Sequence, residues 1–133
     1  MSSKINLKLR VSVVGGPEIS LSDEIPVEAY DKIDVTIVTG DSDKEVVIQP
    51  VLSEMVQLLL IRASEYGKSL TYKVHKKTDA TPIALDKEQL FLGKGAVGLL
   101  GTELDKFFFT NNLGKDVTIE ILIGRDAIPE PQP

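Results

Sequence analysis

The 133-residue sequence predicts an all-β protein, an antiparallel β-sandwich or jelly roll of about eight strands. Two observations favour this fold. Short runs of alternating apolar and polar residues recur along the chain at fairly even spacing, and turn-forming residues follow each run. The apolar residues are chiefly valine, isoleucine and leucine, since only three tyrosines and four phenylalanines are present, and β-branched residues favour strands. Even spacing of short strands indicates a sandwich rather than alternating strands and helices.

The first strand is expected from Ile5 to Val13, where apolar residues alternate with polar ones. Such alternation gives a strand with one buried face and one face in water. Gly-Gly-Pro at 15–17 ends the strand, because proline cannot continue a hydrogen-bonded ladder. Ile19 and Leu21 suggest a second short strand. Pro26 argues against a central strand in its segment, because proline cannot donate a hydrogen bond to the ladder, and an edge strand or a loop is expected there.

Residues 33–37 and 46–48 also alternate, and a short Gly/Asp turn at 40–43 joins them. Two alternating runs around such a turn predict a β-hairpin. Residues 51–66 fit either a helical face or a strand. We favour a strand from Val56 to Ala63, buried on both faces, because it is a compact apolar run among strands of similar length.

The second half of the chain contains the most regular strand, residues 117–123. Shorter strands are expected at 70–74 and 89–92. We predict antiparallel pairing of residues 106–111 with residues 116–123 around the Asn/Gly turn between them. Ile119 and Ile121 are expected to be buried together.

Residues 1–127 are predicted to form one domain, followed by a tail at 128–133. The tail contains three prolines and is expected to be an extended arm of polyproline II type. Such an arm loses little entropy when it docks on a partner, so it can act as a contact segment. The tail and two phenylalanines are therefore the candidate protein-interaction residues, namely Phe107, Phe109, Ile128, Pro129, Pro131 and Pro133.

The composition makes several partners and cofactors improbable. The net charge is −5, so the chain lacks the positive field that binds nucleic acid. The chain has no cysteine, which excludes disulfides and thiolate metal sites. No apolar leader follows Met1, and the longest apolar run, Leu58 to Ile61, is too short to cross a membrane. We expect no membrane partner.

No motif in the chain indicates catalysis. Residues 93–98 match the dinucleotide pattern GxGxxG, but the spacing to the next strand leaves no room for the helix that this pattern requires. A turning loop is expected there instead. His75 is the single histidine and is expected on an exposed strand face. The acidic residues 41–45 are interpreted as turn residues rather than calcium ligands. We predict no enzymatic activity, no cofactor and no metal.

Three segments of the last third resemble the carboxyl-terminal strands of small virion proteins of tailed phages, including capsid decoration (cement) proteins. They are LFLGKGAV at 90–97, FFFTNN at 107–112 and VTIEILIGRD at 117–126. The resemblance implies a non-enzymatic homotrimer located in the virion, on the outside of the capsid shell, where it binds the major capsid protein. The alternative is a carbohydrate- or ligand-binding β-sandwich module, with Tyr30, Tyr66 and Tyr72 as candidate stacking platforms.

Overall fold

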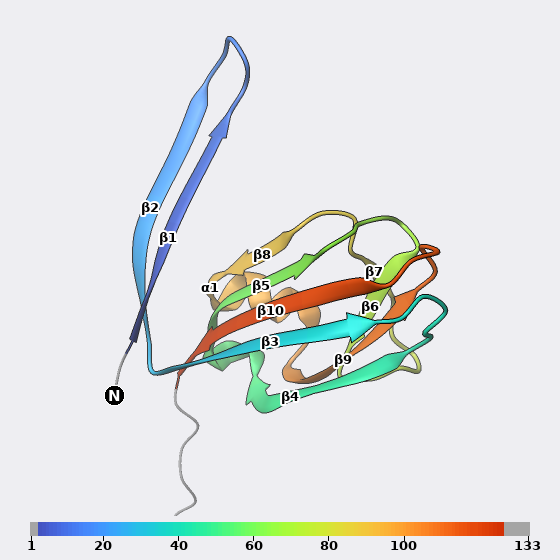
Figure 1. Ribbon diagram of the computed structural model, residues 1–133. Helices are drawn as coiled ribbons and strands as arrows, with labels where there is room; N and C mark the ends of the chain where they lie inside the picture. The colour runs from blue at the N-terminus through green and yellow to red at the C-terminus, as the bar shows by residue number, and fades with distance from the viewer. Residues whose placement is uncertain (1–2, 127–133) are drawn as a thin grey trace, which may run out of the picture.

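The described part of the computed structural model covers residues 3–126, without the side chains of 49–51, and it is an antiparallel β-sandwich with a projecting hairpin (Figure 1). The hairpin consists of β1 (Ser3–Ser12) and β2 (Glu18–Val27). One sheet has the order β3-β10-β5-β8 and the other the order β4-β9-β6-β7. Every sheet pairing is antiparallel. The predicted all-β fold is confirmed.

The first sheet is formed by β3 (Ala29–Ile37), β10 (Val117–Arg125), β5 (Val56–Ala63) and β8 (Gln89–Leu92). The second sheet is formed by β4 (Lys44–Leu52), β9 (Glu103–Asn111), β6 (Leu70–Val74) and β7 (Ile83–Ala84). From β3 onward, each successive strand lies in the opposite sheet from the one before, except at the step from β6 to β7. Most turns therefore cross between the sheets rather than connect neighbours within one sheet.

The core lies between the two sheets and consists mainly of aliphatic side chains. Ile119 and Ile121 are both fully buried there, as predicted. Three aromatic rings from the second sheet pack together, with centroids 5.7–6.1 Å apart: Tyr72, Phe107 and Phe109. The predicted strand from Val56 to Ala63 is β5, and buried residues point to both of its faces. The favoured strand interpretation of this segment is confirmed.

The two hairpins predicted within the sandwich are wrong. Residues 33–37 lie in β3 and pair with β10, whereas residues 46–48 lie in β4, which pairs with β9. Likewise, β9 and β10 lie in different sheets and do not pair with each other. Both turns are arches that carry the chain from one sheet to the other. The turn residues matched the hairpin pattern, but the pattern does not determine which strand becomes the partner.

The two arches are joined at Asn111, which explains why neither closes as a hairpin. The Gly40 amide donates to the Asn111 carbonyl at 2.7 Å, and the Asn111 amide donates to the Asp41 carbonyl at 2.9 Å. The Asn111 side chain is fully buried. Its Nδ2 donates to the carbonyls of Ile37 and Lys115, at 2.9 and 2.8 Å, and its Oδ1 accepts from the Leu113 amide. This one side chain ties both arches to each other.

Two smaller expectations are corrected by the structure. Residues 93–97 form a short helix, α1 (Gly93–Val97), followed by a 3₁₀ turn at Gly98–Leu100, where only a loop was expected. The second strand was expected to be short, but β2 runs over ten residues and includes Pro26. Proline is compatible with this position because each strand of a two-stranded ribbon has one free edge.

We predict that Asn111→Asp destabilises the protein, because a carboxylate would face the carbonyls of Ile37 and Lys115 with no proton to donate. The expected loss is about 2–4 kcal/mol in the free energy of unfolding. Urea denaturation measures it. Asn112→Asp is the matched control, since the Asn112 side chain is exposed, and it should change stability by less than about 0.5 kcal/mol. Equal effects of the two substitutions would contradict the role assigned to Asn111.

Candidate functional site

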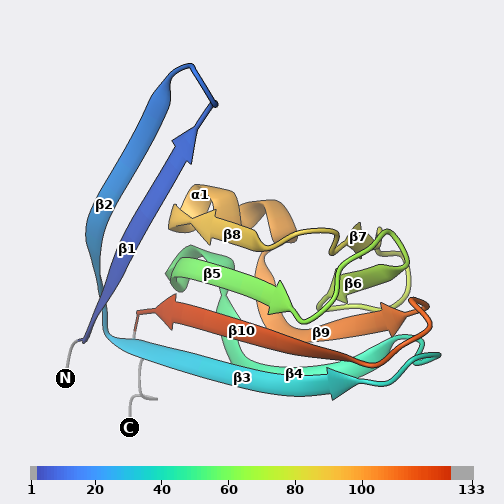
Figure 2. The same ribbon diagram turned by 45° about the horizontal axis from the view of Figure 1, so that its top comes forward.

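The hairpin is fastened to the sandwich at its base, over Gly124 of β10. A side-chain Cβ at Gly124 would lie 2.5 Å from Ile5 Cδ1 and 3.0 Å from Val27 Cγ1. Val27 is buried, and Ile5 is half-buried. The glycine is therefore required for the close approach of the hairpin to the first sheet. Beyond this base the hairpin projects away from the sandwich, as both views show (Figures 1 and 2).

The outer half of the hairpin carries apolar side chains that the other described residues leave exposed. Leu9 is opposite Leu21, and Val11 is opposite Ile19, so these four side chains share one face of the ribbon. We call them the arm face. Their exposed fractions are 42% for Leu9 and Leu21, 54% for Val11 and 71% for Ile19. Val13 and Val14 at the tip are exposed as well.

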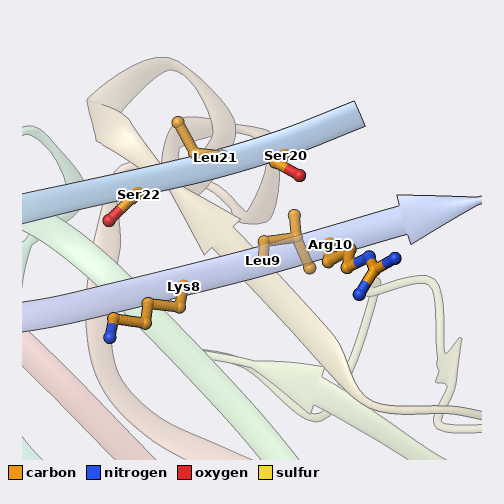
Figure 3. Close-up of a pocket in the computed structure, with 6 residues that line it drawn as sticks. All are labelled: Lys8, Leu9, Arg10, Ser20, Leu21 and Ser22. Carbon is orange, nitrogen blue, oxygen red and sulfur yellow. The ribbon is translucent and has the colours of Figure 1, made fainter. Parts of the chain in front are cut away.

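The opposite face of the same ribbon is polar. Lys8 and Arg10 alternate with the leucine and valine of β1, and Ser20 and Ser22 alternate with the apolar residues of β2. Figure 3 shows Leu9 and Leu21 near one another, with Lys8 and Arg10 directed away from them. Arg10 forms an ion pair with Glu18. The hairpin is thus strongly two-sided, and its apolar side is available for contact.

A second apolar surface, partly exposed, lies on the outer face of the first sheet. The register places Leu60 beside Leu122 and Leu90, in a row across β10, β5 and β8. These three leucines are half-buried. Tyr30, one row away on β3, is 59% exposed. We call Tyr30, Leu60, Leu90 and Leu122 the outer patch.

Charged residues border the outer patch on the side away from the hairpin. The next row across the sheet contains Asp34, Glu120 and Arg62. Lys32 forms ion pairs with Asp34, at 2.6 Å, and with Glu120, at 3.2 Å. The outer patch is therefore an apolar area with a charged rim. This is the usual composition of a protein contact surface.

A crevice separates the inner part of the hairpin from the end of the first sheet. It has a volume of about 320 Å³ and is lined by Leu7, Leu21, Asp23, Ile25, Gln57, Leu92 and Gly93. Most of these side chains are apolar, and one carboxylate lies among them. The crevice shows that the apolar face of the hairpin is turned toward the end of the first sheet here but does not pack tightly against it.

Of the predicted interaction residues, the two that the structure describes lie away from these surfaces. Phe107 and Phe109 have no exposed area and contact Tyr72 in the core, so in the folded domain they contribute to the core rather than to an outer surface. Ile128, Pro129, Pro131 and Pro133 lie outside the described residues. Of the three candidate sugar platforms, Tyr72 is buried and Tyr66 is half-buried, which leaves Tyr30 exposed.

His75 lies between two carboxylates. Its Nδ1 is 2.7 Å from Asp105 Oδ1, and its Nε2 is 3.0 Å from Glu103 Oε2. Burial favours the neutral form of Asp105, but the hydrogen bond and the charge of His75 outweigh it and lower the pKa of that carboxyl. Among residues 3–126, no group of three histidine or carboxylate side chains is arranged to hold a metal ion. The arrangement is a surface ion-pair cluster.

The glycine-rich motif does not form a dinucleotide site of the usual kind. The helix that begins at the first glycine, α1, has five residues, and Gly101 with φ +118° ends the turn after it. A pyrophosphate site of this type needs a longer helix behind the glycines. Among the described helices, none has the length and apolar character needed to span a bilayer.

Comparisons with protein-family models, with curated proteins and with solved structures find no match to this chain. The function is therefore inferred from the arrangement of the side chains. Fold and site together define a β-sandwich with a projecting two-sided hairpin. Its two exposed apolar surfaces, the arm face and the outer patch, are the candidate contact sites.

Sequence reasoning missed the arm face, although part of its signal was visible. The alternation from Ile5 to Val13 correctly predicted a strand with one apolar face. We expected the sandwich to bury that face, but its outer half is exposed. The continuing alternation from Ile19 through Ile25, after a short Gly-Gly-Pro turn, was the sign of a long hairpin. Asp23 interrupts this alternation, and the structure places it on the apolar face of the hairpin, opposite Leu7. A carboxylate at this position is consistent with a face that the sandwich does not bury.

We predict that Gly124→Ala loosens the hairpin without unfolding the sandwich, because the added Cβ would collide with Ile5 and Val27. Such overpacking costs about 1–3 kcal/mol. Trypsin should cleave after Lys8 and Arg10 faster by about tenfold or more, because cleavage follows local opening. Gly95→Ala is the matched control, since a Cβ there meets nothing within 4 Å. Unchanged cleavage in Gly124→Ala would show that Gly124 does not fasten the hairpin.

We also predict that the titration of Asp105 depends on His75. Because the folded-state pKa of Asp105 is lowered, its carboxylate stabilises the fold at neutral pH, and this contribution is lost as pH falls through that lowered pKa. His75→Gln should shift the Asp105 midpoint upward in a carbon-detected NMR titration. Lys76→Gln, which leaves His75 in place, should shift it far less. Identical midpoints in the wild type and in His75→Gln would refute the assignment.

Proposed function

We propose that the protein is a non-enzymatic structural component of a phage particle, a capsid decoration protein that binds the major capsid protein from outside the shell. The observation that carries the proposal is the arm face, an exposed apolar strip on a projecting hairpin. Monomeric proteins rarely expose contiguous apolar surface unless it is used for contact. A protein built around such a surface acts by assembling.

The order of the strands supports the capsid proposal. Eight strands in two sheets, ordered β3-β10-β5-β8 and β4-β9-β6-β7, are what two interleaved Greek keys produce. We interpret this arrangement as a jelly roll, a fold common among viral capsid proteins and lectins. The resemblance of residues 90–97, 107–112 and 117–126 to phage virion proteins points to the capsid use of that fold.

The assembled form that we propose is a homotrimer. Closed ring symmetry lets each copy use the same surfaces in the same way. The proline tail, residues 128–133, is proposed as a second contact segment, toward either another copy or the shell. Its composition favours an extended conformation that needs no fold of its own to bind.

We predict that the protein co-sediments with shells when it is co-expressed with the major capsid protein of the same phage. The expected amount is stoichiometric, because decoration proteins occupy repeated sites on a lattice. Quantitative gel analysis of shells purified on a sucrose gradient measures it. A variant lacking residues 128–133 should bind less while its unfolding temperature stays unchanged. Intact shells that leave all of the protein in the supernatant would contradict the capsid role.

A further inference from the structure

We propose that the arm face of one copy docks on the outer patch of a second copy of this chain. The inference extends the proposed function by naming a partner and a site for the arm. It does not depend on the phage assignment, since contact between two copies needs no capsid.

The arm face has exposed apolar side chains that the rest of residues 3–126 does not cover. A two-stranded hairpin alone in water is marginally stable, and it needs packing against another element. Here the base of the hairpin, at Ile5 and Val27, packs closely on the first sheet, and a crevice separates the part beyond the base from the end of that sheet. The side chains of the arm face remain 42–71% exposed. The views in Figures 1 and 2 show the outer part of the hairpin pointing away from the sandwich.

The outer patch is the surface on the same molecule that suits the arm face. Both surfaces are apolar strips on antiparallel strands, with side chains in cross-strand rows. The rows on the arm are Leu9 with Leu21 and Val11 with Ile19. The patch offers a row of three leucines beside the exposed ring of Tyr30. Two twisted β-surfaces of this kind pack face to face through interdigitating side chains.

Charge makes a second copy a better occupant than a polyanion. The hairpin contains three basic residues, Lys4, Lys8 and Arg10, and three acidic ones, Glu18, Asp23 and Glu24, so its net charge is zero. The rim of the outer patch is balanced too, with Lys32 and Arg62 against Asp34 and Glu120. Two neutral surfaces approach each other without repulsion. Neither provides the positive field that nucleic acid or an anionic membrane would require.

The size of the contact indicates a closed assembly. A fully buried aliphatic side chain removes about 60–120 Å² from water, and the side chains of both surfaces are already partly covered, so one arm on one patch buries roughly 300 Å² of apolar surface. At the usual apolar share of an interface, this corresponds to about 500 Å² in all. A stable interface needs about 1,000 Å² or more. Each copy has one arm and one patch. An assembly in which every copy both gives and receives an arm therefore reaches the required area for each chain.

Cross-linking between two single-cysteine variants tests the contact directly, because the chain has no cysteine of its own. Leu9→Cys places a thiol on the arm face, and Leu60→Cys places one on the outer patch. An equal mixture of the two, treated with a short bis-maleimide, should give a covalent dimer. The matched control mixes Leu9→Cys with Val47→Cys, a 68% exposed position on β4 of the other sheet, and it should give little dimer.

A second pair of variants keeps the test decisive if a cysteine disturbs the surface. Leu9→Lys with Leu21→Lys should weaken self-association by about tenfold or more, because the charges would be buried without partners. Ser20→Lys with Ser22→Lys adds the same charge to the polar face and should change it less than about twofold. Light scattering measures the association, and circular dichroism shows that each variant is folded.

The outcomes separate this inference from the capsid proposal. Equal or absent cross-linking at Leu60 and Val47, or equal effects of the two lysine pairs, would overturn arm docking even if the protein binds shells. Specific cross-linking at Leu60 without shell binding would support arm docking and refute the capsid role. A chain that stays at its 14.5 kDa monomer mass at high concentration would overturn the inference altogether.

Discussion

The apolar face of the hairpin is left without a covering layer by the rest of residues 3–126, and this constraint governs the functional proposals. A ribbon of two strands can satisfy its ladder hydrogen bonds within itself, but it has no second layer to bury its apolar side. The sandwich fastens only the base, through the close approach over Gly124. We propose that cover for Leu9, Val11, Ile19 and Leu21 comes from another molecule. The functional proposals follow from this exposure.

The sandwich itself is complete without a partner. Its core is closed by two four-stranded sheets, and the arches between them are tied together by the buried side chain of Asn111. The outer face of the first sheet lies next to the base of the hairpin. The first sheet offers a leucine row with a charged rim. We propose that this leucine row and the projecting arm serve self-assembly.

The sequence was sufficient for much of the fold and for little of the contact site. Alternation located most strands, and the compact run from Val56 to Ala63 identified a strand buried on both faces. Strand partners were wrong at both arches, because a Gly/Asp or Asn/Gly turn has the same composition whether it closes a hairpin or crosses between sheets. Phe107 and Phe109 were expected at a contact surface and lie in the core. Alternation shows that a face is apolar, but it cannot show what covers that face.

Hydrogen exchange of the hairpin amides, measured over a range of protein concentrations, tests the central claim most directly. If a second copy covers the arm, the amides of β1 and β2 beyond the base should exchange more slowly as the concentration rises, in parallel with self-association. The amides of β6 and β9, which lie in the other sheet, should keep the same protection throughout. Hairpin amides that are equally protected at every concentration would show that the arm needs no partner, and the account would fail.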